Sequence, residues 1–281
     1  MSMMSDDTAA PVKALAKRLR NRAFRAVSVV ERIVRWRRED LLPPAHLRVY
    51  YYGTIKPRVF ETMCRTVRTE VISRGLLPNH RVLDIGSGIG NLAIGLLDYS
   101  RGGYDGVEIH PEAVAWCQQT ITPGHQNFRF HRADIASRAY NPTGIQSPST
   151  YRFPFPDESF DFIVLGSVFT HMLPGDVTHY VQEIARLLKP RGVCIASYLL
   201  INDERRPAIE ANRSFMSFAI EHPSGLCRLH DARIPEAAVA LEEDFVMRIH
   251  EDAGLAIRDI RRGGWWNGEM HDQDVLTSAL K

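Results

Sequence analysis

Residues 82–93 read VLDIGSGIGNLA and decide the fold. A short apolar run contains Asp84 near its end and breaks into three glycines at every second position, Gly86, Gly88 and Gly90. An apolar strand that gives way to a glycine-rich turn and then a helix is typical of nucleotide-binding α/β folds. The stretch therefore predicts a nucleotide pocket, but it leaves open which nucleotide is bound.

The glycine spacing argues against a nicotinamide dinucleotide. In the dinucleotide fingerprint a third glycine lies three residues after the second, and position 91 here is Asn. Asp84 would also repel a pyrophosphate, whereas a ligand with a cationic amino group and a sulfonium would tolerate or use this carboxylate. Both observations favour the cationic ligand.

Two more acidic residues follow the next two predicted strands. Glu108 ends the second strand, where a carboxylate can accept hydrogen bonds from both hydroxyls of an adenosine ribose. Asp134 follows the third strand and can accept a hydrogen bond from an adenine amino group. Ligands of open α/β sheets bind at the carboxyl ends of the strands, so we expect Asp84, Glu108 and Asp134 to lie around one crevice.

From residue 80 onward, strand-like and helix-like segments alternate, which predicts a parallel sheet covered by helices. Long ordered insertions in compact domains are commonly lids, so the Pro-containing segment 201–236 is predicted to be one. The predicted strands are 81–85, 104–108, 127–131, 160–165, 192–198, 256–262 and 274–280, and the predicted helices are 90–99, 111–120, 176–188 and 237–253.

Five stretches occur together in this order: RVLDIGSGIGNLAIGL, YDGVEIHPEAVAWCQ, FHRADI, FPFPDESFDFIVLGSVFTHML and VQEIARLLKPRGVCIASY. With them the chain resembles the class I S-adenosylmethionine-dependent methyltransferases from about residue 78 to 200. The resemblance implies a Rossmann-like, doubly wound α/β fold with a seven-stranded, mostly parallel sheet, helices on both faces and an antiparallel last strand. It also implies S-adenosylmethionine as cofactor.

The resemblance further implies which residues hold that cofactor. The methionine end is expected at Asp84, Gly86, Ser87 and Gly88, the ribose at Glu108 and Ile109, and the adenine at Asp134 and Ile135. Gly90, Gly166 and Ser167 complete the expected cofactor site.

The stretches LLIND, IPEAAVALEEDFVMRIHEDAGL and GGWWNG are similar to a large bacterial group of small-molecule methyltransferases with a lid after the fifth strand. This narrower resemblance implies an enzyme that moves a methyl group to a small-molecule or glycan-type acceptor by in-line displacement. Two alternatives stay open: methylation of RNA or protein, and a non-catalytic binding protein on the same fold. Residues 41–281 are expected to form the methyltransferase domain, with a core at 78–200 and a C-terminal helix and hairpin at 237–281.

His171, in GSVFTHMLP after the fourth strand, is the candidate catalytic residue. Its imidazole titrates near neutral pH and can take a proton from an acceptor hydroxyl or amine, or it can simply line the pocket. Aromatic and polar residues near the crevice are the candidates for contacting the acceptor. They are Tyr51, Tyr52, Trp265, Trp266 and His271.

The net charge of +2 conceals a basic segment, because residues 11–38 contain ten Lys and Arg against one Glu. Apolar residues recur there at helical spacing, so residues 1–40 are predicted to hold a basic amphipathic helix. The helix could dock on the main domain or on a second copy in a homodimer, adsorb to the inner face of a membrane, or contact an acidic partner.

The chain shows neither a secretory signal nor an apolar run of membrane-spanning length, so we expect a cytoplasmic protein. Its four cysteines form no CxxC pair, which agrees with a reducing compartment. The histidines and cysteine of HPSGLCRLH at 222–230 match no common zinc spacing, so no metal is expected. DNA is not an expected partner either.

Overall fold

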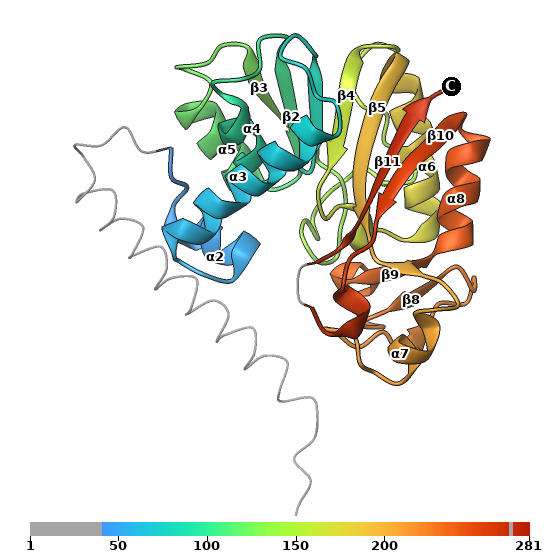
Figure 1. The fold of residues 1–281 in the computed structure, drawn as a ribbon. Helices are drawn as coiled ribbons and strands as arrows, with labels where there is room; N and C mark the ends of the chain where they lie inside the picture. Colours follow the sequence, from blue (N-terminus) through green and yellow to red (C-terminus); the bar gives the residue numbers. More distant parts are fainter. Residues whose placement is uncertain (1–40, 270–271) are drawn as a thin grey trace, which may run out of the picture.

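The structure is a computed structural model that describes residues 41–269 and 272–281. Its centre is a seven-stranded sheet in the order β10-β11-β5-β4-β1-β2-β3 (Figure 1). Only β11 runs antiparallel to its neighbours, so the predicted doubly wound fold with an antiparallel last strand is confirmed. The strands are β1 Val82–Ile85, β2 Tyr104–Glu108, β3 Phe128–Arg132, β4 Phe160–Leu165, β5 Leu188–Tyr198, β10 Leu255–Arg261 and β11 Asp274–Leu280.

Both faces of this sheet are covered, and β1 and β2 are buried along their whole length. In β1, Val82 packs into the cluster on one face, whereas Leu83 and Ile85 pack into the cluster on the other. Helices on the Val82 face are α3 Pro57–Ser73, α4 Asn91–Leu96 and α5 Pro111–Thr120, and those on the Leu83 face are α6 Pro174–Leu187 and α8 Glu243–Asp252.

A short helix before the sheet, α2 Ala45–Tyr52, places three tyrosines near the glycine turn. It is anchored by Arg48, whose side chain is only 1% exposed and donates hydrogen bonds to the carbonyl oxygens of Pro43 and Ile55. The sequence patterns used above predicted neither α2 nor α3.

A second, four-stranded sheet lies below the carboxyl end of β5 in Figure 1, and the predicted lid 201–236 supplies its strands β7 and β8. Helix α7 Arg206–Glu210 lies beside it. The strand order is β6 Leu200–Ile201, β9 Val239–Glu242, β8 Cys227–Leu229 and β7 Ile220–Glu221.

Strand β9 corrects the predicted helix 237–253, which begins only at Glu243. The residues Val239, Ala240 and Leu241 are completely buried, and β9 pairs with β6 on one side and β8 on the other. Burial and pairing on both sides therefore override a helix-like local sequence.

Three single-turn helices complete the described chain: η2 Phe169–His171, η3 Pro235–Ala237 and η4 Trp265–Asn267. None of the helices that the structure describes combines the length and apolar composition of a membrane-spanning segment. The predicted basic helix at 11–38 lies outside the described residues.

Candidate functional site

A cavity of about 260 Å³ lies at the carboxyl ends of the main sheet. Its wall includes the ends of β1, β2 and β4, the loop after β3, and residues of α2, η2, α6 and η3. Six of the predicted cofactor residues line it: Gly86, Glu108, Ile109, Ile135, Gly166 and Ser167. The crevice expected from the strand order is therefore present, and it gathers residues from distant parts of the chain.

The glycine turn approaches its neighbours too closely for side chains. Gly86 has a φ of 76°, and a Cβ there would lie 2.4 Å from Cγ2 of Val168. Gly88 has a φ of 52°, and a Cβ would lie 3.2 Å from Cε1 of Tyr51. Positive φ and close packing both require glycine at these positions. Helix α2 thus lies directly against the turn.

Glu108 is held in a fixed orientation at the cavity wall by three backbone N–H donors. Gly88 donates to one carboxylate oxygen at 2.9 Å, and Ile109 and His110 donate to the other at 2.7 and 2.8 Å. Burial raises the pKa of Glu108, and these backbone hydrogen bonds oppose that rise. A carboxylate oriented in this way can still accept hydrogen bonds from ligand hydroxyls.

Asp84 lies behind the glycine turn and not on the cavity wall. It is buried, and the hydroxyl of Tyr104 donates a hydrogen bond to its carboxyl group. The pKa of Asp84 is raised to about 7, mainly because the carboxyl group is buried. The hydrogen bond from Tyr104 opposes this rise, and the charge of Glu108 adds to it. Gly88, Gly90 and Ser87 are also absent from the wall, and the Ser87 hydroxyl is buried without a hydrogen-bond partner among the described residues.

The raised pKa of Asp84 predicts a pH-dependent stability. Between the unfolded pKa of 3.8 and the folded value of about 7, the folded state binds more protons, so stability falls as pH rises. The variant Asp84→Asn keeps an acceptor for Tyr104 but does not titrate. We therefore expect its free energy of unfolding to rise relative to that of the wild type as pH rises from 5 to 8. Urea unfolding of both proteins measures the difference, and parallel pH profiles would contradict it.

Asp134 does not face the cavity, although its neighbour Ile135 does. The carboxylate of Asp134 accepts hydrogen bonds from Arg132 and from the amide of Asn141, each at 3.1 Å. Both bonds go to one carboxylate oxygen and tie Asp134 to the loop that follows β3. The contact of Asp134 with adenine stays a prediction.

His171 lies on the cavity wall. Its Nδ1 is 3.0 Å from the carbonyl oxygen of Glu236, and the hydroxyl of Tyr140 lies 3.2 Å from Nδ1 and 3.0 Å from Nε2. A carbonyl only accepts, so the Nδ1 proton points to Glu236 and Nε2 carries the free electron pair. Burial lowers the pKa of His171, partly offset by the backbone of Glu236 and Ala237, so the ring is neutral at neutral pH.

Tyr51 lines the cavity together with Tyr50, whereas Tyr52 packs against Phe60 in a separate cluster. Tyr51 therefore lies where it could contact the acceptor, as expected, whereas Tyr52 does not.

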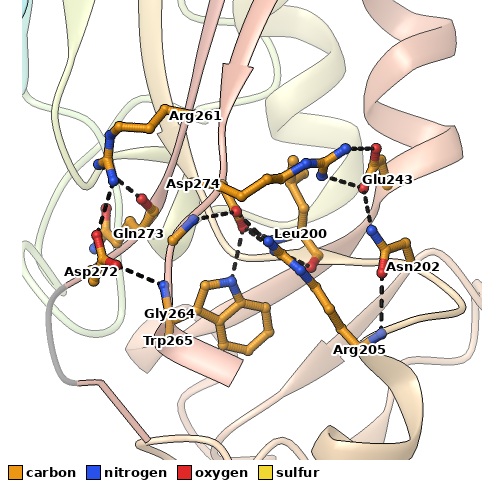
Figure 2. A network of polar contacts seen from close by, with 12 residues as sticks. Leu200, Asn202, Arg205, Glu243, Arg261, Gly264, Trp265, Asp272, Gln273 and Asp274 are labelled. Atoms are coloured by element: carbon orange, nitrogen blue, oxygen red, sulfur yellow. Dashed lines mark hydrogen bonds and ion pairs between the residues drawn. The ribbon is translucent and has the colours of Figure 1, made fainter. Parts of the chain in front are cut away.

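Neither tryptophan lines the cavity, and the burial of Trp265 corrects its expected stacking on the acceptor. Trp265 is fully buried, and its indole N–H donates to Asp274 at 2.8 Å (Figure 2). Trp266 packs against the buried apolar cluster that contains Trp265, and the guanidinium of Arg205 lies 5.9 Å above the Trp266 ring. His271 lies outside the described residues.

Sequence reasoning missed five polar residues of the wall: Ser137, Tyr140, Asp176, Tyr180 and Glu236. Tyr140 lies in a loop without a recognisable pattern, and Glu236 lies at the end of the segment predicted only as a lid. Within the described ranges 41–269 and 272–281, no group of three or more His, Cys, Asp or Glu side chains is placed to hold a metal ion.

Comparison with known proteins agrees with this architecture. Residues 83–196 match the family described as a methyltransferase domain. The uncharacterized methyltransferase YcgJ of Bacillus subtilis is 34% identical over 116 residues, which are 40% of this chain and 38% of that protein. The tRNA N(3)-cytidine methyltransferase METTL2 of Gallus gallus is 26% identical over 125 residues, which are 43% of this chain and 30% of that protein.

Among solved structures, magnesium protoporphyrin IX methyltransferase of Synechocystis PCC 6803 with bound S-adenosylhomocysteine has the same fold. The TM-score is 0.52 at 17% identity, over 80% of this chain and 85% of that one. The matched part of the chain is a class I S-adenosylmethionine-dependent methyltransferase domain. The chain spans 55%, 30% and 38% of the length of three curated relatives that it matches.

Proposed function

We propose that the protein transfers the methyl group of S-adenosylmethionine to a hydroxyl or amine of a small-molecule acceptor, glycan-type molecules included. The observation that carries the proposal is that Gly86 and Glu108, suited to the cofactor, line the same cavity as the neutral base His171. Proximity of donor, acceptor and base is the main requirement of an in-line methyl transfer.

The wall fits the cofactor on two observations. Gly86 brings the backbone of the glycine turn to the cavity wall, and the fixed carboxylate of Glu108 lies on the same wall as an acceptor for two ribose hydroxyls. When bound, S-adenosylmethionine supplies a methyl carbon activated by a positively charged sulfur. Ile109 and Ile135 offer apolar contacts on the same wall.

Polar groups at another part of the wall suit the acceptor. Asp176 and Glu236 line the cavity with His171, and one carboxylate oxygen of Glu236 is buried without a hydrogen-bond partner among the described residues. Burial raises the pKa of Asp176, and the charge of Glu236 adds to this rise. An acceptor that brings hydrogen-bond donors would satisfy these oxygens, which supports a hydroxyl- or amine-bearing molecule.

His171 is the group that takes the acceptor proton in this proposal. The hydroxyl of Tyr140 is nearly equidistant from Nδ1 and Nε2, at 3.2 and 3.0 Å, so it does not lie on the in-plane electron pair of Nε2. An acceptor hydroxyl placed in line with that electron pair would deliver its proton to Nε2. The carbonyl of Glu236 keeps the ring in the required tautomer and would stabilise the imidazolium that forms. The wall therefore supplies both the base and its orientation.

The variant His171→Ala tests this role. We expect turnover to fall by roughly 100-fold or more, the usual size of a general-base contribution. The acceptor is first found by incubating the protein and isotopically labelled donor with cell extracts. S-adenosylmethionine binding, measured by calorimetry, should remain. His179→Ala, a half-buried histidine outside the cavity wall, is the control, and near-normal turnover of His171→Ala would exclude the base role.

A macromolecular acceptor is the second candidate, because one relative is named a tRNA N(3)-cytidine methyltransferase. The same labelled-donor assay with total RNA and with protein as separate fractions distinguishes the two. Label recovered in RNA or protein but not in the small-molecule fraction would favour this candidate. A protein that binds neither S-adenosylmethionine nor S-adenosylhomocysteine would instead be non-catalytic.

A further inference from the structure

A second cavity, of about 270 Å³, lies at the amino ends of β1, β2 and β3, whereas the first cavity lies at the carboxyl ends of the strands. Three arginines line it. Arg81 directly precedes β1, Arg101 lies in the turn before β2, and Arg129 lies in β3. The exposed Gly102 and the adjoining Gly103 bring the turn of Arg101 beside the other two strands.

The strand register explains why these side chains gather. Asp105 of β2 lies directly opposite Arg129 of β3, so their side chains are on the same face of the sheet. Gly103 has a φ of 104°, and nothing lies closer than 3.8 Å to a Cβ built there, so the turn leaves the space between the strands open. The result is a concave site walled largely by backbone and guanidinium groups.

Only one of the three arginines is neutralised. Arg81 donates to Asp105 at 2.9 Å, and its guanidinium lies 4.7 Å above the ring of Phe160. His131 shares the same carboxylate at 2.8 Å. Burial raises the pKa of Asp105, but the hydrogen bonds from His131 and Arg81 outweigh this and keep it below its usual value. Asp105 is therefore ionised and fixes the position of Arg81.

The side chains of Arg101 and Arg129 have no ion-pair or hydrogen-bond partner among residues 41–269 and 272–281. The cavity lining thus holds three guanidinium groups against one carboxylate. A concave surface with an excess of one charge concentrates ligands of the opposite charge, and guanidinium groups bind phosphate oxygens in pairs of parallel hydrogen bonds.

We propose that this second cavity binds a phosphate group, with Arg101 and Arg129 as its direct ligands and Arg81 as a third, fixed cation. The phosphate could arrive as free inorganic phosphate or as part of a nucleotide, since both present the same dianion. The proposal does not depend on the methyltransferase function, because no residue of this site lines the first cavity.

Calorimetric titration of the full chain with inorganic phosphate, AMP and ADP, in a phosphate-free buffer, tests the site. We expect binding by the wild type and a dissociation constant raised about tenfold or more in Arg101→Ala and in Arg129→Ala, as for the loss of a hydrogen bond to a charged group. Arg129→Lys keeps the charge but not the paired geometry, so it should bind more weakly than the wild type. Arg258→Ala, an exposed arginine of β10, is the matched control.

The outcomes are distinct. Equal affinity for phosphate and nucleotides, lost in both alanine variants, supports free phosphate; tighter nucleotide binding with the same losses supports a nucleotide. The absence of binding to all three probes, or variants that bind like Arg258→Ala, overturns the proposal. Retained S-adenosylmethionine binding and an unchanged melting temperature show that the variants are folded.

Discussion

Replacing Asp274 with alanine is expected to lower the free energy of unfolding by about 3–5 kcal/mol, the range measured when one partner of a buried ion pair is removed. Asp274 is fully buried and pairs with Arg205 at 2.8 Å. Its carboxylate also accepts hydrogen bonds from the backbone N–H groups of Leu200 and Gly263 and from the indole of Trp265 (Figure 2). The variant leaves all four donors without this acceptor.

Two further variants separate the ion pair from a general loss of packing. The double variant Asp274→Ala with Arg205→Met removes the unpaired guanidinium, so it should recover part of the lost stability. Asp259→Ala is the matched control, because the Asp259 side chain is exposed and its ion pair with Arg74 should contribute less than about 1 kcal/mol. Urea unfolding measures all three. A loss no larger for Asp274→Ala than for Asp259→Ala would contradict the central role of Asp274.

The second large effect is expected for cofactor binding in Glu108→Gln. Both carboxylate oxygens of Glu108 already accept backbone N–H donors, so an amide nitrogen at either place would meet a donor instead of an acceptor. The substitution also weakens the hydrogen bonds to two ribose hydroxyls by removing the charge. We expect the dissociation constant for S-adenosylmethionine to rise by about 100-fold, roughly 3 kcal/mol.

Calorimetric titration measures this change, with Glu251→Gln, an exposed residue of α8, as control. A melting curve shows whether the glycine turn has been disturbed, because Gly88 donates to the same carboxylate. Wild-type affinity in Glu108→Gln would exclude Glu108 as a ribose ligand and would move the cofactor to another part of the wall.

The part of the fold that could be predicted from sequence is the part whose signals are local. The apolar run at 82–85, the glycines after it and the Pro and Gly boundaries of the helices define strands and turns within a few residues. Parallel strands then bring their carboxyl ends to one edge, so Gly86 and Glu108 could be placed together without coordinates. These predictions depend only on residues that are close in sequence and on the rule that parallel strands end at the same edge of a sheet.

The remainder depends on partners that are distant in sequence. Val239–Glu242 is a strand because β6 and β8 lie on either side of it, which no local pattern reveals. Trp265 looks like a binding residue until the buried carboxylate of Asp274 is seen beside its indole. Tyr140 reaches His171 from a loop 31 residues earlier, and only the fold makes that contact predictable.

The wall of the first cavity includes both Tyr51 of α2 and Glu236 of η3, although 185 residues separate them in the chain. During synthesis, a growing chain has no complete cavity until residue 236 has left the ribosome and η3 has docked. Ligands of this cavity therefore cannot assist the early folding of α2 and β1. They can stabilise only a nearly finished molecule, which makes their binding a measure of completed folding.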